Sequence, residues 1–362
     1  MINLTSDNWS GAHPKISEAL LRHCDGGATA YGASVLDKKI ERTFNEIFES
    51  DVAVYFVGTG TAANALSMAY LNRAGGIIFA HRHAHLIEDE CGAPEYFTGG
   101  ARLVGVGGAE GRIDPEALES AIRRYDPADP DSVHAGPSNG RVRHAEHGKR
   151  HTLLIGTNPS HCEHCARARH SPAHGWGTVH KCTEMSWKSG VDILSFGASK
   201  NGCWCAEAIL VFNDLQKAHK DFPYLRKRAA HLFSKTRFIA AQFEAYFADG
   251  LWLKNARHAN EMASRLASFV LSMDSKSVRL AWTPQANEVF VVMRRSVADG
   301  LRSIGRISPF YEWAHGSGDV RDSLGTEEAL YRLVTTFATT AEEIDEFGTL
   351  LEKQCLEAAQ LS

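Results

Sequence analysis

The stretch Val191-Asp192-Ile193-Leu194-Ser195-Phe196-Gly197-Ala198-Ser199-Lys200-Asn201-Gly202 joins an apolar run to a turn of small residues that presents one lysine. The apolar run predicts a buried strand, and the glycine that follows the lysine allows a tight turn. A lysine at the end of a strand is well placed to form a Schiff base with a carbonyl cofactor. An ordinary surface lysine in a turn fits this stretch equally well, so the rest of the chain has to decide between the two interpretations.

Strand and helix patterns alternate through the first third of the chain. We expect strands over 52–57, 76–80 and 101–106, and helices over 62–71, from 88 onward, and from Pro115 with Asp114 as its cap. This alternation predicts an α/β fold in which a mainly parallel sheet is covered by helices on both faces.

The later part of the chain has a different pattern. We expect a long helical span over 237–271, strands over 288–293 and 331–337, and a final helix over 340–359. These patterns predict an N-terminal arm over 1–25, a large domain over 26–250 and a smaller C-terminal α+β domain over 251–362.

Composition narrows the class of protein. The chain of 362 residues is 44% hydrophobic and 23% charged, which is ordinary for a soluble globular protein. The net charge of −4 gives no reason to expect a nucleic acid or an anionic membrane as a partner. The N-terminus lacks the features of a signal peptide, and the eight cysteines have no regular spacing, which is typical of free thiols in a reducing compartment. We therefore expect a cytoplasmic protein that acts on a small molecule.

A second motif, Gly58-Thr59-Gly60-Thr61, stands between an expected strand and an expected helix. In this arrangement backbone N–H groups and the helix N-terminus can bind an anion, although a tight turn uses the same residues for shape alone. The motif does not fit G-x-x-x-x-G-K-[ST], so we expect a ligand with one phosphate rather than three.

Several separate motifs together resemble the threonine aldolases of the aromatic amino acid β-eliminating lyase/threonine aldolase family. They are the setting of Lys200, Gly58-Thr59-Gly60-Thr61, Ser6-Asp7-Asn8, Tyr31-Gly32, His85 with Glu90, and Arg332-Leu333-Val334-Thr335. The resemblance covers roughly 1–133 and 183–362. It implies the transferase-like fold of type I, with a sheet of the seven-stranded type, pyridoxal 5′-phosphate as cofactor, and a homodimer or homotetramer.

The resemblance also implies roles for single residues in the binding of the cofactor. Lys200 would bind pyridoxal 5′-phosphate covalently, and Gly58, Thr59 and Gly60 would hold its phosphate. His85 would stack on the pyridine ring with Glu90 beside it, and would take the proton of the substrate β-hydroxyl.

Two further residues would bind the substrate, a β-hydroxy-α-amino acid. Arg332 would clamp its carboxylate as a two-pronged donor, and Ser6 would add a hydroxyl. A structural histidine and a surface arginine are the alternatives for His85 and Arg332. The implied reaction is retro-aldol cleavage of threonine or allo-threonine to glycine and acetaldehyde.

One segment departs from the family pattern. The family supplies a carboxylate to the pyridine nitrogen as the Asp of an Asp-Gly-Ala-Arg motif, because a protonated ring stabilises the carbanion. This chain has no such motif, and its segment 134–182 is a mixture of Gly, Pro, Arg and His that holds nine of the eighteen histidines. The segment offers no Val/Ile/Leu run for a buried parallel strand.

Two interpretations of this segment compete. His161-Cys162-Glu163-His164-Cys165 has the look of a metal site, which His174, His180 or Cys182 could complete. We favour the other interpretation, translation in a shifted frame, and therefore expect no metal ligands. Read one base later, the codons of 174–182 can encode Met-Asp-Gly-Ala-Arg-Phe-Thr-Asn-Ala, which contains the missing motif. Those of 139–154, shifted in the same way, can encode a stretch that resembles the family's preceding segment.

The shifted frame implies compensating insertions or deletions near Ala135 and just after Cys182. As it stands, the chain lacks the pyridine-nitrogen Asp and the adjacent Arg. We therefore predict poor packing, weak retention of the cofactor and little or no aldolase activity. A related β-eliminating lyase that uses the same cofactor, and a non-catalytic homologue with a Cys/His metal-binding insert, remain as alternatives.

Overall fold

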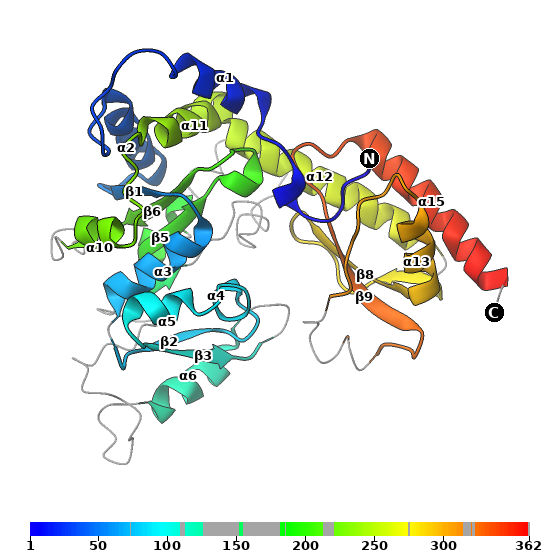
Figure 1. The fold of residues 1–362 in the computed structure, drawn as a ribbon. Coiled ribbons are helices and arrows are strands. Elements are labelled where there is room, and N and C mark those ends of the chain that lie inside the picture. Colours follow the sequence, from blue (N-terminus) through cyan, green and yellow to red (C-terminus); the bar gives the residue numbers. More distant parts are fainter. Residues whose placement is uncertain are drawn as a thin grey trace.

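A computed structural model of the chain describes residues 1–72, 74–108, 113–125, 152–154, 182–184, 186–212, 221–273, 276–313, 320 and 323–360. Figure 1 shows two groups of elements, one around β1, β5 and β6 and the other around β8 and β9, with the long helix α12 (Leu251–Ser272) running from the first toward the second. Over these described ranges, no helix is both long enough and apolar enough to cross a membrane.

The first group is built on a four-stranded sheet. Its order is β1 (Ala53–Val57), β6 (Glu207–Val211), β5 (Val191–Gly197) and β4 (Thr152–Leu154). Strand β6 runs antiparallel to both β1 and β5, whereas β4 is parallel to β5. The carboxyl ends of β1 and β5 therefore lie at the same edge of the sheet, where β6 begins. The expected α/β fold is confirmed.

Two further strands, β2 (Ile77–His81) and β3 (Arg102–Val106), pair in parallel as a separate sheet. The described strands of the first group thus form two sheets instead of one continuous sheet.

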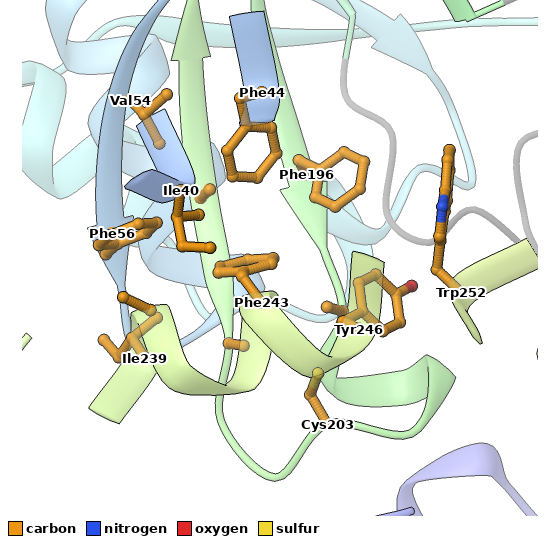
Figure 2. Packing of buried hydrophobic residues seen from close by; sticks show 14 of the residues in the cluster. Ile40, Phe44, Val54, Phe56, Phe196, Cys203, Ile239, Phe243, Tyr246 and Trp252 are labelled. Carbon is orange, nitrogen blue, oxygen red and sulfur yellow. The ribbon is translucent and has the colours of Figure 1, made fainter. Parts of the chain in front are cut away.

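Helices cover both faces of the four-stranded sheet, as the apolar character of its strands predicts. Every residue of β5 and β6 is buried, which is typical of strands enclosed on both sides. On one face, α2 (Val35–Phe48) and α11 (Arg237–Phe247) bring Phe44 and Phe243 against Phe196 of β5 (Figure 2), and the Phe44 and Phe196 rings lie 5.3 Å apart in an edge-to-face contact. On the other face, α3 (Gly60–Leu71) packs on Ile193 and Ile209.

Strand β4 differs from the expectation for segment 134–182. The prediction that this segment offers no parallel strand is wrong for its three residues, because Leu153 and Leu154 pair with Ile193 and Leu194 of β5. A short apolar run of Leu-Leu is sufficient for one row of ladder hydrogen bonds beside a strand that is already buried. The remainder of the segment, except 182, lies outside the described residues.

The short helices near β2 and β3 only partly follow the sequence pattern. In place of one helix from residue 88, the chain forms α4 (His85–Glu88) and α5 (Ala93–Thr98). They are separated by Cys91 and Gly92, which have positive φ angles of 53° and 74°. The helix predicted from Pro115 is confirmed as α6 (Pro115–Arg124), and the carboxylate of Asp114 accepts the N–H of Ala117 at 2.8 Å. Helices α1 (Pro14–Arg22) and α10 (Phe222–Arg228) complete this group.

The second group is a three-stranded antiparallel sheet with helices on one face (Figure 1). Its strands, in spatial order, are β7 (Val278–Leu280), β8 (Glu288–Arg294) and β9 (Glu328–Val334). Part of α12 packs on it together with α13 (Arg295–Ser303) and α15 (Ala341–Gln360). The side chains of Ile2 and Leu4 are buried in the same hydrophobic cluster. The division into 1–25, 26–250 and 251–362 stays a prediction.

Candidate active site

The two motifs that the sequence singled out meet at the edge where β6 begins. Val57, the last residue of β1, and Gly197, the last residue of β5, both pair with Glu207, the first residue of β6. Strand β1 leads directly into Gly58, and β5 leads into the turn that carries Lys200. The sheet therefore places the glycine loop and the lysine turn on either side of one buried carboxyl group.

The lysine turn is a single 3₁₀ turn, η4 (Ser199–Asn201), in which Lys200 is half-buried. The amide of Asn201 donates to the Tyr246 hydroxyl at 2.7 Å and to the carbonyl of Trp252 at 3.0 Å. Gly202 has a φ of +108°, and a Cβ at this position would come within 2.7 Å of the Asn255 side-chain nitrogen. The glycine is therefore required both by the backbone conformation and by the close approach of α12.

The residues after this turn are held by one buried side chain of α11. The backbone N–H groups of Trp204 and Cys205 both donate to the Gln242 Oε1 at 2.9 Å, and the Gln242 Nε2 donates back to the carbonyl of Cys205 at 3.0 Å. Gln242 is only 1% exposed. Sequence analysis missed Gln242, Tyr246 and Asn255. The feature that could have indicated them is a polar group on an otherwise apolar face of a helix.

The glycine loop has the geometry of an anion-binding helix start. The Thr59 hydroxyl accepts the N–H of Ala62 at 3.1 Å, which leaves the N–H groups of Gly60 and Thr61 without an acceptor inside the helix. These two donors and the helix dipole favour a negative charge at this point.

Two aromatic residues that sequence analysis missed shape the other side of this loop. The N–H of Gly58 donates to the His231 Nδ1 at 3.3 Å, and burial lowers the pKa of His231, which favours the neutral ring that can accept. A Cβ at Gly58 would lie 2.8 Å from the Phe233 ring, so glycine is what allows this ring to close against the loop.

The side chain of His85 is oriented by a buried carboxyl group. The His85 Nδ1 lies 3.0 Å from the Glu90 Oε1, and the same oxygen accepts from the Asn64 Nδ2 at 2.6 Å. The Glu90 side chain has no accessible surface, whereas the His85 side chain is 45% exposed. Asn64 belongs to α3, the helix that begins at Gly60, so α3 joins the glycine loop to His85. Asn64 was not predicted, and only its polarity within an apolar helix distinguishes it.

The N-terminal segment brings Ser6 toward the lysine turn. The Ser6 hydroxyl accepts the N–H of Asn8 at 3.2 Å and so caps the short 3₁₀ turn η1 (Asp7–Trp9), which contacts η4. The N–H of His13 donates to the carbonyl of Gly202 at 2.8 Å. These contacts place the N-terminal segment beside the lysine turn.

Arg332 lies on β9, and its side chain is held by two neighbours. The guanidinium stacks on Trp313, 4.5 Å from the ring centroid, and its Nη1 lies 3.3 Å from the Glu288 Oε1. The N–H of Val334 donates to the carbonyl of Leu4 at 2.9 Å, which ties β9 to the segment just before Ser6. The described contacts therefore link β9 to the N-terminal segment, but the Arg332 side chain itself pairs with Glu288 and not with Ser6.

Comparison with known proteins found similar sequences. A family model described as beta-eliminating lyase matches residues 3–134. A low specificity L-threonine aldolase from Pseudomonas sp. (strain NCIMB 10558) is 35% identical over 339 residues, which cover 90% of this chain and 94% of the relative. Another protein of that description, from Pseudomonas aeruginosa, is 34% identical over 315 residues, 83% of this chain and 86% of the relative.

Solved structures show the same fold. A threonine aldolase from Leishmania major has a TM-score of 0.79 at 20% identity and covers 98% of this chain and 100% of its own. A putative L-allo-threonine aldolase from Listeria monocytogenes has a TM-score of 0.65 at 14% identity, with coverages of 98% and 97%. A serine palmitoyltransferase from Sphingomonas wittichii has a TM-score of 0.60 at 17% identity, with coverages of 97% and 86%.

The fold is therefore that of the type I enzymes that depend on pyridoxal 5′-phosphate, as predicted. Within that class, the extent and identity of the match to the Pseudomonas proteins settle the family: the chain belongs to the threonine aldolases, a family of lyases.

The family match also bears on segment 134–182, which departs from the family pattern. The match to the family model ends at residue 134, one residue before the position at which we placed the first change of frame. The candidate metal ligands of 161–165 and the codons of 174–181 lie outside the described residues. Within the part of the chain that the structure describes, no three His, Cys, Asp or Glu side chains are grouped as a metal site.

Proposed function

We propose that the site of this chain is that of an aldolase, which cleaves β-hydroxy-α-amino acids such as threonine or allo-threonine to glycine and acetaldehyde with pyridoxal 5′-phosphate as cofactor, and that this activity is impaired in the chain as it stands. The observation that carries this proposal is the meeting of the Lys200 turn and the Gly58–Gly60 loop across Glu207. The substrate class is supported by the Pseudomonas relatives, which are low specificity L-threonine aldolases.

The described residues fit this cofactor. Gly60 and Thr61 offer two N–H groups at a helix start to its phosphate, and Thr59 supplies the cap that keeps them oriented. Lys200 supplies the amine for covalent attachment at the other side of Glu207. The Glu90 Oε2 and the Asn64 Oδ1 are buried without a hydrogen-bond partner among the described residues, so the polar groups near His85 have unused acceptors within this part of the structure.

His85 is the residue that we propose moves the proton of the β-hydroxyl. Because the Glu90 carboxylate accepts at 3.0 Å from the Nδ1, the ring proton is assigned to that nitrogen. The Nε2 then keeps a free lone pair and can accept the β-hydroxyl proton while the Cα–Cβ bond breaks and the aldehyde departs. The donation from Asn64 to Glu90 holds the carboxylate in position for this role.

The cofactor, when bound, supplies an electron sink for the carbanion that remains at Cα. Arg332 and Ser6 are proposed to bind the substrate carboxylate, Arg332 through the nitrogens that Glu288 does not engage. The stacking of Arg332 on Trp313 fixes the plane of the guanidinium, which reduces the rotamer freedom lost on binding.

The chain as it stands is proposed to be impaired, because its sequence has no Asp-Gly-Ala-Arg motif. The first test is to resequence the coding DNA across the codons for 135–183. The second is to prepare the chain as it stands, a chain in which 135–182 is re-encoded in the shifted frame, and the Lys200→Ala variant of the re-encoded chain. Each is incubated with threonine or allo-threonine and pyridoxal 5′-phosphate, and glycine and acetaldehyde are measured.

We expect products only from the re-encoded chain with Lys200 intact. A Lys353→Ala variant of that chain is the matched control, because it also removes one amine, from an exposed position on α15, and is expected to stay active. Normal turnover by the chain as it stands would refute the proposed impairment, and turnover by the Lys200→Ala variant would refute the role of Lys200.

A related β-eliminating lyase is the second candidate, because the matching family model carries that description. The two candidates differ in their products, since an elimination would release pyruvate and ammonia from a β-substituted amino acid such as serine. Pyruvate without glycine in the same assay would favour the elimination.

We also propose that the protein is cytoplasmic, because its eight cysteines have no regular spacing, and, on the family resemblance alone, that it forms a homodimer or homotetramer. Light scattering of the purified re-encoded chain tests the assembly, and a monomer at micromolar concentration would contradict it.

A further inference from the structure

Glu207 is a buried acid that none of the proposed steps uses. It is 7% exposed and stands at the start of β6, directly between the last residue of β1 and the last residue of β5. Burying a glutamate side chain at the edge of a sheet costs folding free energy unless its carboxyl group is paired or neutral. Its position therefore calls for a reason beyond packing.

The two carboxyl oxygens of Glu207 face different parts of the site. The Oε1 accepts the backbone N–H of Ser199 at 3.3 Å, next to Lys200. The Oε2 points to the glycine loop and lies 3.9 Å from the position that a Cβ of Gly60 would occupy. One oxygen is thus an acceptor for the lysine turn, while the other is turned toward the proposed phosphate cradle.

A negative charge at this place would oppose a phosphate. The cradle at Gly60 and Thr61 attracts anions, and an ionised carboxylate beside it would repel the ligand that the cradle binds. A protonated carboxyl group would instead offer an O–H donor from Oε2 and keep Oε1 as an acceptor.

We propose that Glu207 serves the site in its protonated form, as a hydrogen-bond donor toward a phosphate held at Gly60, so that binding of a phosphate ester is coupled to uptake of one proton. This inference rests on the proposed function, because it assumes that the glycine loop holds the phosphate of pyridoxal 5′-phosphate. It assigns Glu207 as a binding residue for that group.

The charges around Glu207 are consistent with protonation near neutrality. Burial raises the pKa of Glu207 to about 7, although hydrogen bonds from Ser199 and the charge of Lys200 oppose this rise. A bound phosphate would add a negative charge beside the carboxyl group, which favours its protonated form.

The other titratable groups that face Glu207 do not change charge in the same pH range. Burial raises the pKa of the Cys203 and Cys205 thiols and of the Tyr246 hydroxyl, so these groups stay neutral. On the glycine loop, burial lowers the pKa of His231, so that ring is already neutral above pH ~6.5.

The test uses pyridoxine 5′-phosphate, whose alcohol cannot react with Lys200. Its Kd is measured by calorimetry from pH ~6.5 to ~8.5 for the chain as it stands, for Glu207→Gln and for the exposed-surface control Glu119→Gln. In the unmutated chain and the control, the Glu207 carboxylate must take up one proton before the ligand binds at any pH above its pKa. The Kd should therefore rise by about tenfold per pH unit at the alkaline end of the range. Glu207→Gln should bind equally well throughout, about thirtyfold more tightly than the unmutated chain at the highest pH.

A second measurement needs no variant. Calorimetry of the unmutated chain in two buffers of different ionisation enthalpy counts the protons exchanged on binding, and we expect an uptake approaching one at pH ~8.5 and little at pH ~6. Pyridoxine without phosphate should show no such uptake.

Each outcome decides a separate point. Binding without proton uptake, or weaker binding by Glu207→Gln, would overturn this inference, because Glu207 would then act as an ionised partner of Lys200; the proposed cofactor would stand. If neither the unmutated chain nor the re-encoded chain binds pyridoxine 5′-phosphate or pyridoxal 5′-phosphate at any pH, the proposed cofactor is refuted and this inference falls with it.

Discussion

Replacement of Gly202 by alanine tests whether the lysine turn depends on the close approach of α12. Gly202 has a φ of +108°, and an added Cβ would lie 2.7 Å from the Asn255 Nδ2. That nitrogen donates to the carbonyl of Asn201 at 2.9 Å in a buried setting. Alanine at 202 therefore strains the backbone and also displaces the amide that holds the turn.

The two costs can be estimated separately. Holding an alanine at positive φ costs about 1–2 kcal/mol. Displacing the Asn255 amide leaves the carbonyl of Asn201 unsatisfied, which adds about 1–3 kcal/mol. We therefore expect Gly202→Ala to lower the free energy of unfolding by about 2–5 kcal/mol, a large share of the stability of an ordinary domain.

Gly190 is a matched control at the other end of β5. It has a φ of +94°, but a Cβ there would meet nothing within 4 Å, so Gly190→Ala should show only the backbone cost. Urea unfolding of both variants, of Asn255→Ala and of the double variant forms a mutant cycle. In the Asn255→Ala background, Gly202→Ala should cost only about 1–2 kcal/mol. An equal cost for Gly202→Ala and Gly190→Ala would refute the argument.

Three other substitutions probe separate contacts. Asn64→Leu in the re-encoded chain removes a charge-assisted hydrogen bond to Glu90. We therefore expect kcat to fall by roughly tenfold or more and the pH profile of kcat to shift. A lower stability with an unchanged pH profile would show that Asn64 is a structural residue only. Gly58→Ala pushes the Phe233 ring away from the loop and should weaken pyridoxal 5′-phosphate binding about tenfold, unlike Gly27→Ala, whose Cβ meets open space. The hydrogen bonds from Arg279 lower the pKa of the Glu328 carboxyl, so their stabilisation exists above its unfolded pKa of about 4.3 and is lost as pH falls. Glu328→Gln should therefore cost about 1 kcal/mol in urea unfolding at pH ~7 and almost nothing at pH ~3, whereas an equal cost at both would contradict the ion pair.

Much of the fold could be predicted because single elements carry strong local signals. Strand β5 has an apolar run, and α6 has an Asp cap before a proline, and both appear as expected. The break of the long helical span at Asp249 was missed, since apolar residues recur at helical spacing on both sides of it. The structure shows that Asp249 and Gly250 adopt positive φ angles of 53° and 64°, which end α11 and start α12 in a new direction.

The site was less predictable, because its anchoring contacts join distant parts of the chain. The motif residues follow from their order in the sequence, but Gln242 and Asn255 reach the lysine turn from helices more than thirty-five residues away, over separations of 37 and 54 residues. Glu207 has a role only because β6 inserts between β1 and β5. No local pattern specifies that insertion, since an apolar strand that begins with Glu can occupy any edge of a sheet.

Segment 134–182 separates two properties that normally occur together in such a site, the binding of the cofactor and the stabilisation of the carbanion. Lys200, the glycine loop, Glu90 and Asn64 all lie outside 134–182, and the hydrogen bonds described above for the loop, Glu90 and Asn64 join residues that also lie outside it. The carboxylate for the pyridine nitrogen, in contrast, would have to come from within it. The chain as it stands is therefore expected to bind a phosphate ester, more weakly than the re-encoded chain but with the pH dependence of Glu207, and yet to leave the carbanion without its stabilising partner. Comparison with the re-encoded chain would then measure what that carboxylate contributes to the rate, because the rest of the site is the same in both.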